Sequence, residues 1–284
     1  MPNEIIGIST FLEGNNGFFI GISVLAGLLI GSFLNVLIYR LPKIMQQEWE
    51  NNCLELQGIA IPKLKEYSIV RPRSACPHCG QMIHALENIP IISYLILNGR
   101  CSACKTRIAL RYPLIEALTG VLFGLISWKF GYSISALFAS ILTCALITLT
   151  FIDFDTQLLP DDITLPLIWA GLLFNLDNGF TNINSAVIGA VVGYLSLWLI
   201  YWLFKFITGK ESMGYGDFKL FAALGAWFGW QLLPAIILVS SLLGAITGMG
   251  IIMWTKRSSQ IPIPFGPFLA IGGIAPLFLG NQFV

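Results

Sequence analysis

Two aspartates beside apolar segments are the residues of this chain best suited to chemistry. Asp153 follows the apolar run 134–152, and Asp217 ends the tetrad Gly214-Tyr215-Gly216-Asp217, after which another apolar run begins. Aspartic proteolysis uses one ionised carboxylate, which takes a proton from water, and one protonated carboxylate, which donates to the scissile carbonyl. Two neighbouring carboxylates favour this shared-proton state, so neither residue is assigned a fixed role as acid or base.

Both aspartates also have an ordinary structural interpretation. Asp153 could be an interfacial side chain that reaches toward water, and Asp155 offers a second carboxylate two positions further on. Asp217 could cap the start of a helix. However, Gly214 and Gly216 allow the backbone to turn tightly just before this carboxylate, which favours a built site.

Three further acidic residues lie at or near apolar runs. Asp161 and Asp162 follow Pro160 and precede a new apolar segment, a pattern that predicts helix capping. Glu116 lies about one turn into the apolar run 113–130, where a carboxylate should face the protein interior or a cavity. Its role stays open between structure and function.

Four cysteines form two C-x-x-C knuckles. They are Cys76 and Cys79, then Cys101 and Cys104, with 21 residues between the pairs. This spacing is typical of a tetrahedral four-thiolate metal site, most often zinc. Two disulfides or a redox pair are the alternatives, and a reducing cytoplasm argues against stable disulfides. Because four thiolates leave no open coordination position, we expect a structural metal, with His78 and His84 as solvated loop residues.

Composition indicates a membrane protein. Hydrophobic residues make up 56% of the chain and charged residues 11%, with a mean hydropathy of +0.77. A hydrocarbon core roughly 30 Å thick requires about 20 apolar residues per helix. The chain offers about eight runs that approach this length, so we expect an all-α polytopic membrane protein with about eight transmembrane helices. The short sixth run is the exception, since it could be re-entrant rather than spanning. The expected spans are 17–39, 113–130, 134–152, 163–176, 186–204, 218–230, 232–254 and 264–279.

The basic residues predict the orientation of these spans, since Lys and Arg accumulate in cytoplasmic loops. Ten of the 16 lie between the first two spans: Arg40, Lys43, Lys63, Lys65, Arg71, Arg73, Arg100, Lys105, Arg107 and Arg111. With eight spans, Lys205, Lys210, Lys256 and Arg257 fall on the same side, and Lys129 lies opposite. Both aspartates are then expected at cytoplasmic span ends.

Three domains follow from this arrangement. Residues 1–39 form an N-terminal segment and the first transmembrane helix, and residues 40–112 form a cytoplasmic cysteine-rich zinc-binding domain. Residues 113–284 form a seven-helix membrane domain that carries the aspartate pair. Between the knuckles, Ala85 to Leu97 is largely apolar but too short to span, so we expect it in the headgroup region.

Several ordered motifs together resemble the type IV prepilin peptidases, bacterial inner-membrane aspartic proteases of the GxGD kind. They are 31–36 (GSFLNV), the two knuckles, 111–116 (RYPLIE), Ile152-Asp153 with Leu159-Pro160-Asp161, 214–220 (GYGDFKL) and 264–267 (PFGP). In that family the catalytic carboxylates are the aspartate seven residues before the motif proline and the aspartate of GxGD. The resemblance therefore selects Asp153 over Asp155, together with Asp217.

The resemblance implies two activities on the cytoplasmic side of the bacterial inner membrane. The enzyme would remove the basic leader of prepilins and of type II secretion pseudopilins, then methylate the new amino terminus with S-adenosylmethionine. The resemblance places methylation in the amino-terminal region and cysteine loop, including positions such as Gly99. The chain has no G-x-G-x-x-G fingerprint, and we predict no individual methyl-donor contacts.

Two other protein classes compete with this reading. A proton-coupled transporter also uses intramembrane carboxylates, but its site usually lies near the bilayer midplane between repeats, and we find no repeat here. A zinc-binding membrane scaffold without catalysis would leave Gly214-Tyr215-Gly216-Asp217 unexplained. We expect substrate proteins and membrane lipid as partners and no nucleic acid, and the sequence leaves the oligomeric state undetermined.

Overall fold

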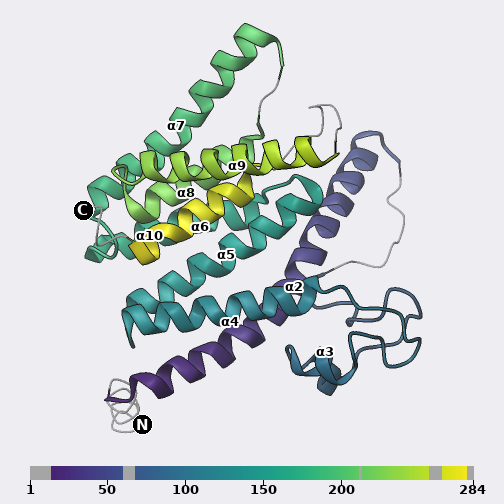
Figure 1. Ribbon diagram of the computed structural model, residues 1–284. Coiled ribbons are helices and arrows are strands. Elements are labelled where there is room, and N and C mark those ends of the chain that lie inside the picture. The colour runs from purple at the N-terminus through teal and green to yellow at the C-terminus, as the bar shows by residue number, and fades with distance from the viewer. Residues whose placement is uncertain (1–13, 60–67, 211–212, 256–263, 280–284) are drawn as a thin grey trace. The chain divides into compact units, whose positions relative to one another are not determined.

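The computed structural model describes residues 14–59, 68–210, 213–255 and 264–279. In these ranges the chain is helical and contains no strand, so the all-α prediction is confirmed (Figure 1). The eight long elements are α2 (Asn16–Leu56), α4 (Arg111–Phe130), α5 (Ile134–Thr156), α6 (Asp161–Phe174), α7 (Ile183–Thr208), α8 (Tyr215–Phe228), α9 (Leu233–Thr255) and α10 (Gly266–Leu279). Each predicted span thus falls on one helix.

Five of these helices, α2, α4, α5, α7 and α9, are long and apolar enough to cross a membrane. The other three, α6, α8 and α10, have 14 residues each and therefore measure about 21 Å, which is less than the hydrocarbon thickness. The protein is an integral membrane protein, and its exact number of spans remains a prediction. Of the basic residues used for orientation, Lys63, Lys65, Lys256 and Arg257 lie outside the described residues.

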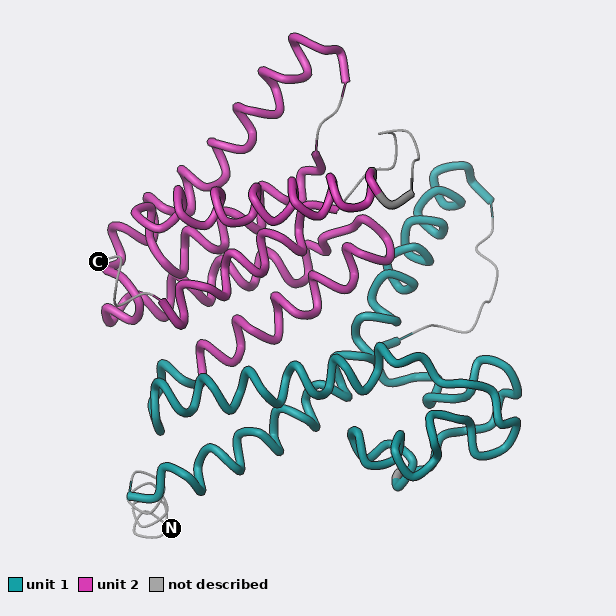
Figure 2. Tube along the Cα trace, viewed as in Figure 1, with its two compact units in different colours: residues 1–136 teal, residues 137–284 magenta. Residues whose placement is uncertain are grey.

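The chain divides into two compact units, residues 1–136 and 137–284 (Figure 2). The first contains α2, α4 and the cysteine loop with the short helices η1 (Ala85–Asn88) and α3 (Ile92–Ile96). The second contains nearly all of α5 and the helices that follow. This division reflects packing, whereas the predicted domain boundaries at 39/40 and 112/113 reflect position relative to the membrane, so those boundaries remain predictions.

Small residues bring α2 and α4 together in the first unit. A Cβ atom on Gly27 would lie 2.9 Å from the Gly120 Cα, and one on Gly31 would lie 2.8 Å from the Glu116 Cα. The two backbones therefore approach closely, as is common for membrane helices, where packing replaces the hydrophobic effect. Gly120 and Gly124 also pack against α2, where they meet Leu28 and Val24.

Helix α2 continues well beyond the predicted span end at residue 39. Its 41 residues measure about 62 Å, roughly twice the thickness of the hydrocarbon core. The sequence changes from apolar to polar after Tyr39, but Pro42 is accommodated and the residues after it favour a helix. The expected loop therefore begins as a helical extension that reaches Leu56.

Helix α8 is the centre of the second unit. Nearly every residue from Asp217 to Phe228 is buried, and the helix packs against α6, α7 and α10. The approach to α7 is closest where Gly189 meets Gly225, since a Cβ atom on either glycine would clash with the backbone of the other. At its C-terminus, the Asn175 amide donates to the Ala226 and Trp227 carbonyl oxygens at 2.8 and 3.0 Å. These bonds satisfy carbonyls that the helix itself leaves unpaired.

Candidate active site and metal centre

Asp153 lies in the last turn of α5 with its side chain enclosed by protein. Only 4% of the residue is exposed, and its Oδ2 accepts a hydrogen bond from the Gly266 N–H at 3.0 Å. Gly266 is the first residue of α10, where the backbone N–H groups have no partner within the helix. Asp155, two positions away, is exposed. The structure thus separates the two candidates and places Asp153 inside.

Asp217 lies in the first turn of α8, directly after the glycine-flanked turn that the sequence indicated. Gly214 is the N-cap residue, and its carbonyl accepts a hydrogen bond from the Asp217 N–H at 3.2 Å. The carboxylate is 7% exposed, and Oδ1 has no hydrogen-bond partner among the described residues. A negative charge here is favoured by the helix dipole. Asp217 and Asp153 lie close enough to interact electrostatically.

Leu159 fills the space between the segments that carry these groups. A Cβ atom on Gly216 would lie 2.6 Å from the Leu159 Cβ, and one on Gly266 would lie 3.2 Å from the Leu159 Cδ2. The same added atom on Gly266 would lie 2.6 Å from Asp153 Oδ2. Both glycines are therefore needed for the close approach of α8 and α10 to the aspartates.

An ion pair that the sequence did not predict connects α6 and α8. Lys219 Nζ donates to both Asp161 carboxylate oxygens at 2.7 Å. The prediction that Asp161 and Asp162 cap α6 is wrong, because Pro160 occupies the N-cap position and no side chain caps the helix. The two aspartates lie in the first turn of α6, where the helix dipole stabilises their negative charge.

The four cysteines converge in the first unit, as their spacing predicted. Their sulfur atoms all lie within 4.8 Å of one another, with Cys76 and Cys104 Sγ 3.8 Å apart and Cys79 and Cys101 Sγ 3.9 Å apart. A tetrahedron with zinc–sulfur bonds of 2.3 Å places its sulfurs about 3.8 Å apart, so the residues fit a zinc ion. Neither histidine of the loop joins the cluster.

The two knuckles have matching backbone hydrogen bonds. The N–H of Gly80 donates to the Cys76 carbonyl, and the N–H of Lys105 donates to the Cys101 carbonyl. Both residues have positive φ angles, 71° and 60°, which close each knuckle tightly. The Thr106 hydroxyl lies 3.2 Å from Cys104 Sγ, and this hydrogen bond, together with one to the Thr106 backbone, lowers the pKa of the Cys104 thiol to about 6. A thiolate at neutral pH is the form that binds metal.

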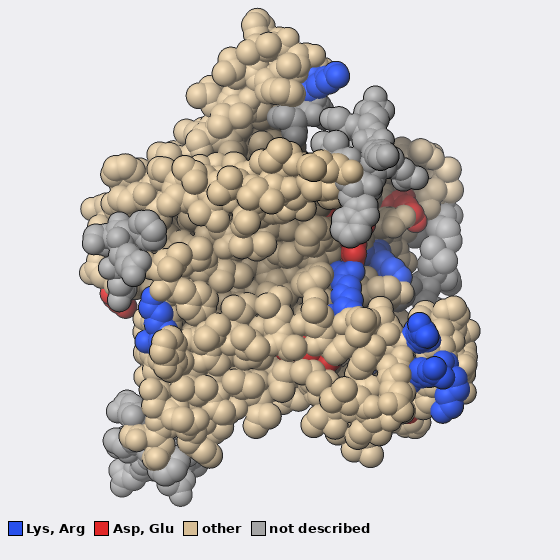
Figure 3. Space-filling model, in the orientation of Figure 1, with Lys and Arg blue, Asp and Glu red and all other residues tan. Residues whose placement is uncertain are grey.

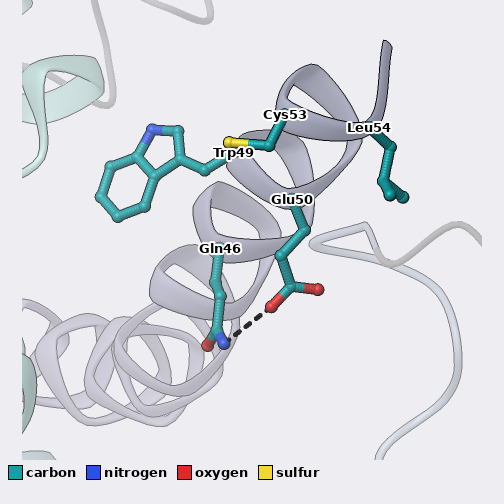
Figure 4. A pocket seen from close by; sticks show the side chains of 5 residues that line it. All are labelled: Gln46, Trp49, Glu50, Cys53 and Leu54. Carbon is teal, nitrogen blue, oxygen red and sulfur yellow. Dashed lines mark hydrogen bonds between the residues drawn. The ribbon is translucent and has the colours of Figure 1, made fainter. Parts of the chain in front are cut away.

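A shallow hollow of about 480 Å³ lies on the extension of α2 (Figure 4). Its lining residues are Gln46, Trp49, Glu50, Cys53 and Leu54, and the Gln46 amide donates to the Glu50 carboxylate at 3.0 Å. S-adenosylmethionine carries a carboxylate that requires a cation or hydrogen-bond donor. The hollow offers no cation, and the Gln46 amide already donates to Glu50, so no contact with the methyl donor is assigned here.

Comparison with known proteins identifies the family. The Bacterial Peptidase A24 N-terminal domain model matches residues 25–130, and the Type IV leader peptidase family model matches residues 140–249. The prepilin leader peptidase/N-methyltransferase of Stutzerimonas stutzeri is 50% identical over 96% of this chain and 94% of its own length. Proteins of the same name from Pseudomonas aeruginosa and Neisseria gonorrhoeae are 51% and 50% identical over 93% and 90% of this chain and 91% and 89% of their own lengths. The chain belongs to the type IV leader peptidase family. No solved structure matches it.

The two family models separate the two candidate sites. Asp153 and Asp217 fall within the leader peptidase match, whereas the four cysteines and Glu116 fall within the N-terminal match. The predicted family is therefore confirmed, and the comparisons give no support to a transporter. Sequence reasoning missed Leu159 as a packing residue and the Lys219–Asp161 pair. Leu159 and Lys219 lie in motifs that were noted only through resemblance, and Asp161 was assigned to helix capping, so no charge or hydropathy pattern marked these contacts.

Proposed function

We propose that this protein removes the leader peptide of type IV prepilins and type II secretion pseudopilins, and then methylates the new N-terminal residue. The central observation is the pair of buried aspartates, Asp153 and Asp217, on the ends of two helices of one compact unit. Leu159 packs against Gly216, which precedes Asp217, and against Gly266, which donates to Asp153, and this shared packing supports one catalytic site. The names of the relatives support both activities.

The geometry suits a shared-proton mechanism. The Gly266 N–H binds Asp153 Oδ2 and leaves Oδ1 for water, while Asp217 Oδ1 has no partner among the described residues. One carboxylate takes a proton from a water molecule, and the oxygen of that water attacks the scissile carbonyl carbon. The other carboxylate donates a proton to the carbonyl oxygen. The two groups titrate as a pair, so their roles are not fixed individually.

The proposed location is the cytoplasmic face of the bacterial inner membrane. Asp153 lies at the end of α5, a helix long enough to cross a membrane, and Asp217 lies at the start of α8, which supports a location near a membrane surface rather than at the midplane. A substrate whose apolar helix lies in the bilayer would present its leader junction at that level. Cleavage there requires little unwinding of the substrate helix.

The cysteine cluster is proposed to hold one structural zinc ion. Cys76, Cys79, Cys101 and Cys104 would bind it and fix the two knuckles relative to each other, and no catalytic step involves the metal. Methylation is proposed to use S-adenosylmethionine as donor. The relatives' names carry this part of the proposal, and it is tested separately from cleavage.

Mass spectrometry of a prepilin produced together with this protein tests both activities. The wild-type protein should yield a pilin without its leader and with an added mass of roughly 14 Da, the replacement of one hydrogen by methyl. Asp153→Asn and Asp217→Asn should each abolish leader loss, because an amide cannot exchange the required proton. Asp155→Asn is the matched control and should cleave normally.

The outcomes separate the two proposals. Leader loss in either the Asp153→Asn or the Asp217→Asn variant would overturn the aspartate mechanism. A cleaved pilin without the added methyl mass would support the proposed peptidase activity and overturn the proposed methyltransferase activity.

A further inference from the structure

The segment between the two knuckles exposes an unusual number of apolar side chains. It contains η1 and α3, and its exposed fractions are 79% for Leu86, 54% for Ile92, 67% for Leu95 and 74% for Ile96. We call these four residues the apolar face of the loop. In Figure 3 the loop around α3 shows mostly uncharged residues, with Lys and Arg gathered beside it. Such a surface on a polar loop indicates an interaction site.

A buried carboxylate attaches this segment to a membrane helix. Glu116 of α4 is 8% exposed, and its Oε2 accepts a hydrogen bond from the Ile91 N–H at 2.8 Å. Ile91 has φ 59° and ψ −49°, a left-handed conformation that a β-branched residue rarely adopts. The surrounding structure must therefore hold the turn at Ile91 in place. Glu116 accepts the hydrogen bond that holds this turn, which gives a structural role to a residue whose role the sequence left open.

The position of Glu116 along α4 sets the depth of the attachment. Glu116 is the fifth residue after Arg111, the first residue of the helix, so it lies at most about 8 Å deeper in the membrane. An amphipathic segment at a membrane interface buries its apolar face about 5–10 Å into the boundary between headgroups and acyl chains. The hydrogen bond therefore places Ile91 and the adjoining apolar face at this boundary.

Charge and continuity favour lipid as the occupant. Exposed Arg100, Lys105 and Arg107 follow the apolar face in the second knuckle, and such residues attract anionic headgroups. Leu114 and Leu118, on the same helix as Glu116, are also exposed. Lipid would cover these two side chains where α4 crosses the membrane, so an apolar face held at the start of α4 lies at the level of lipid.

We propose that Leu86, Ile92, Leu95 and Ile96 insert into the lipid interface, in the leaflet where α4 begins, and that Glu116 fixes the depth of insertion. The four-cysteine loop is then a membrane-bound element rather than a freely solvated one. The inference depends on α4 crossing the membrane and is independent of the proposed leader cleavage.

Photocrosslinking of the full-length protein in vesicles of phosphatidylethanolamine and phosphatidylglycerol tests the insertion. Benzoylphenylalanine replaces one residue at a time: Leu95, the exposed knuckle residue Gln81, or the α4 residue Leu118. Mass spectrometry should find lipid adducts at positions 95 and 118 and several-fold fewer at 81. Equal adduct yields at 95 and 81, or adducts at 95 that join only protein, would overturn the proposal.

Substitutions of Glu116 test the depth-setting role with the same probe at position 95. Glu116→Gln keeps an oxygen acceptor for the Ile91 N–H and should retain the lipid adducts. Glu116→Ala removes the acceptor and should lower the yield at 95 several-fold, with the yield at 118 unchanged as the measure of intact folding. An unchanged yield at 95 in Glu116→Ala would show that Glu116 does not position the apolar face.

Discussion

At the scale of single residues, two glycines, which have no side chain, shape the aspartate site as much as the two carboxylates do. Gly216 precedes Asp217 and packs on Leu159, while Gly266 packs on Leu159 and donates its N–H to Asp153. A methyl group at either glycine would occupy space already taken. The site therefore requires glycine for close packing at these two positions, although neither has a positive φ angle.

We expect Gly266→Ala to lower leader cleavage by about 100-fold, since a misplacement of roughly 1 Å can cost that much in rate. Its Cβ would lie 2.6 Å from Asp153 Oδ2, so the carboxylate or the start of α10 must move. The measurement is the initial rate of prepilin cleavage in membranes at matched protein levels. Gly250→Ala in α9 is the control, because a Cβ there meets nothing within 4 Å. Wild-type cleavage by Gly266→Ala would contradict the close packing at this site.

Gly99 shows the same principle in the cysteine loop. It has φ 64°, and a Cβ atom would lie 2.7 Å from the Tyr94 ring. Its carbonyl accepts a hydrogen bond from the Ile108 N–H at 2.7 Å, which closes the second knuckle. The structure therefore assigns Gly99 a local structural requirement, and the association of this position with methylation needs no donor contact by the residue.

At the scale of elements, the Lys219–Asp161 pair joins two helices beside the active site. Lys219 lies two residues after Asp217, and Asp161 lies two residues after Leu159. The pair is partly exposed, so its contribution to stability should be small, about 0.2–1 kcal/mol. We expect the pair to act mainly by holding Asp217 in position relative to Leu159, so that its loss changes activity more than stability.

We predict that Lys219→Glu and Asp161→Lys each lower cleavage several-fold, and that the double exchange recovers most of the activity. Each single change places two like charges where the ion pair stood, and the double change restores attraction with reversed polarity. Cleavage rates of the four proteins form the cycle, and Asp162→Asn controls for the loss of a neighbouring negative charge. If the two effects simply add, the pair does not position the site.

Sequence patterns predicted the positions of the helices well because turns, glycines, prolines or charged residues separate the apolar runs. The runs of α6, α8 and α10 are too short for their length alone to show a membrane span. Sequence patterns also predicted the cysteine cluster, since the spacing of the knuckles itself encodes the local fold. The extension of α2 to Leu56 was missed because hydropathy marks where the membrane ends, not where the helix ends. The contact between Asp153 and Gly266 spans 113 residues, and only the three-dimensional packing brings these segments together.

At the scale of the whole molecule, the two compact units correspond to two matched families and two kinds of site. The unit of residues 137–284 holds the aspartates, and the unit of residues 1–136 holds the cysteine cluster. A two-step enzyme benefits from this separation if both sites face the same compartment, because the product of cleavage then stays on the side where methylation occurs. The predicted orientation of the helices is therefore a requirement of the proposed function.

We predict that the α4–α5 and α6–α7 connections face the compartment opposite to the cysteine loop. Tyr132 and Asn178 are exposed in these connections, and Asn98 is exposed in the loop. In intact inner-membrane vesicles or cells, Tyr132→Cys and Asn178→Cys should react with a membrane-impermeant maleimide from the periplasmic side, whereas Asn98→Cys should react only after permeabilisation. The native cysteines make the unsubstituted protein the necessary background control. Reaction of all three positions from one side would reject the eight-span arrangement and, with it, a shared cytoplasmic location of the two sites.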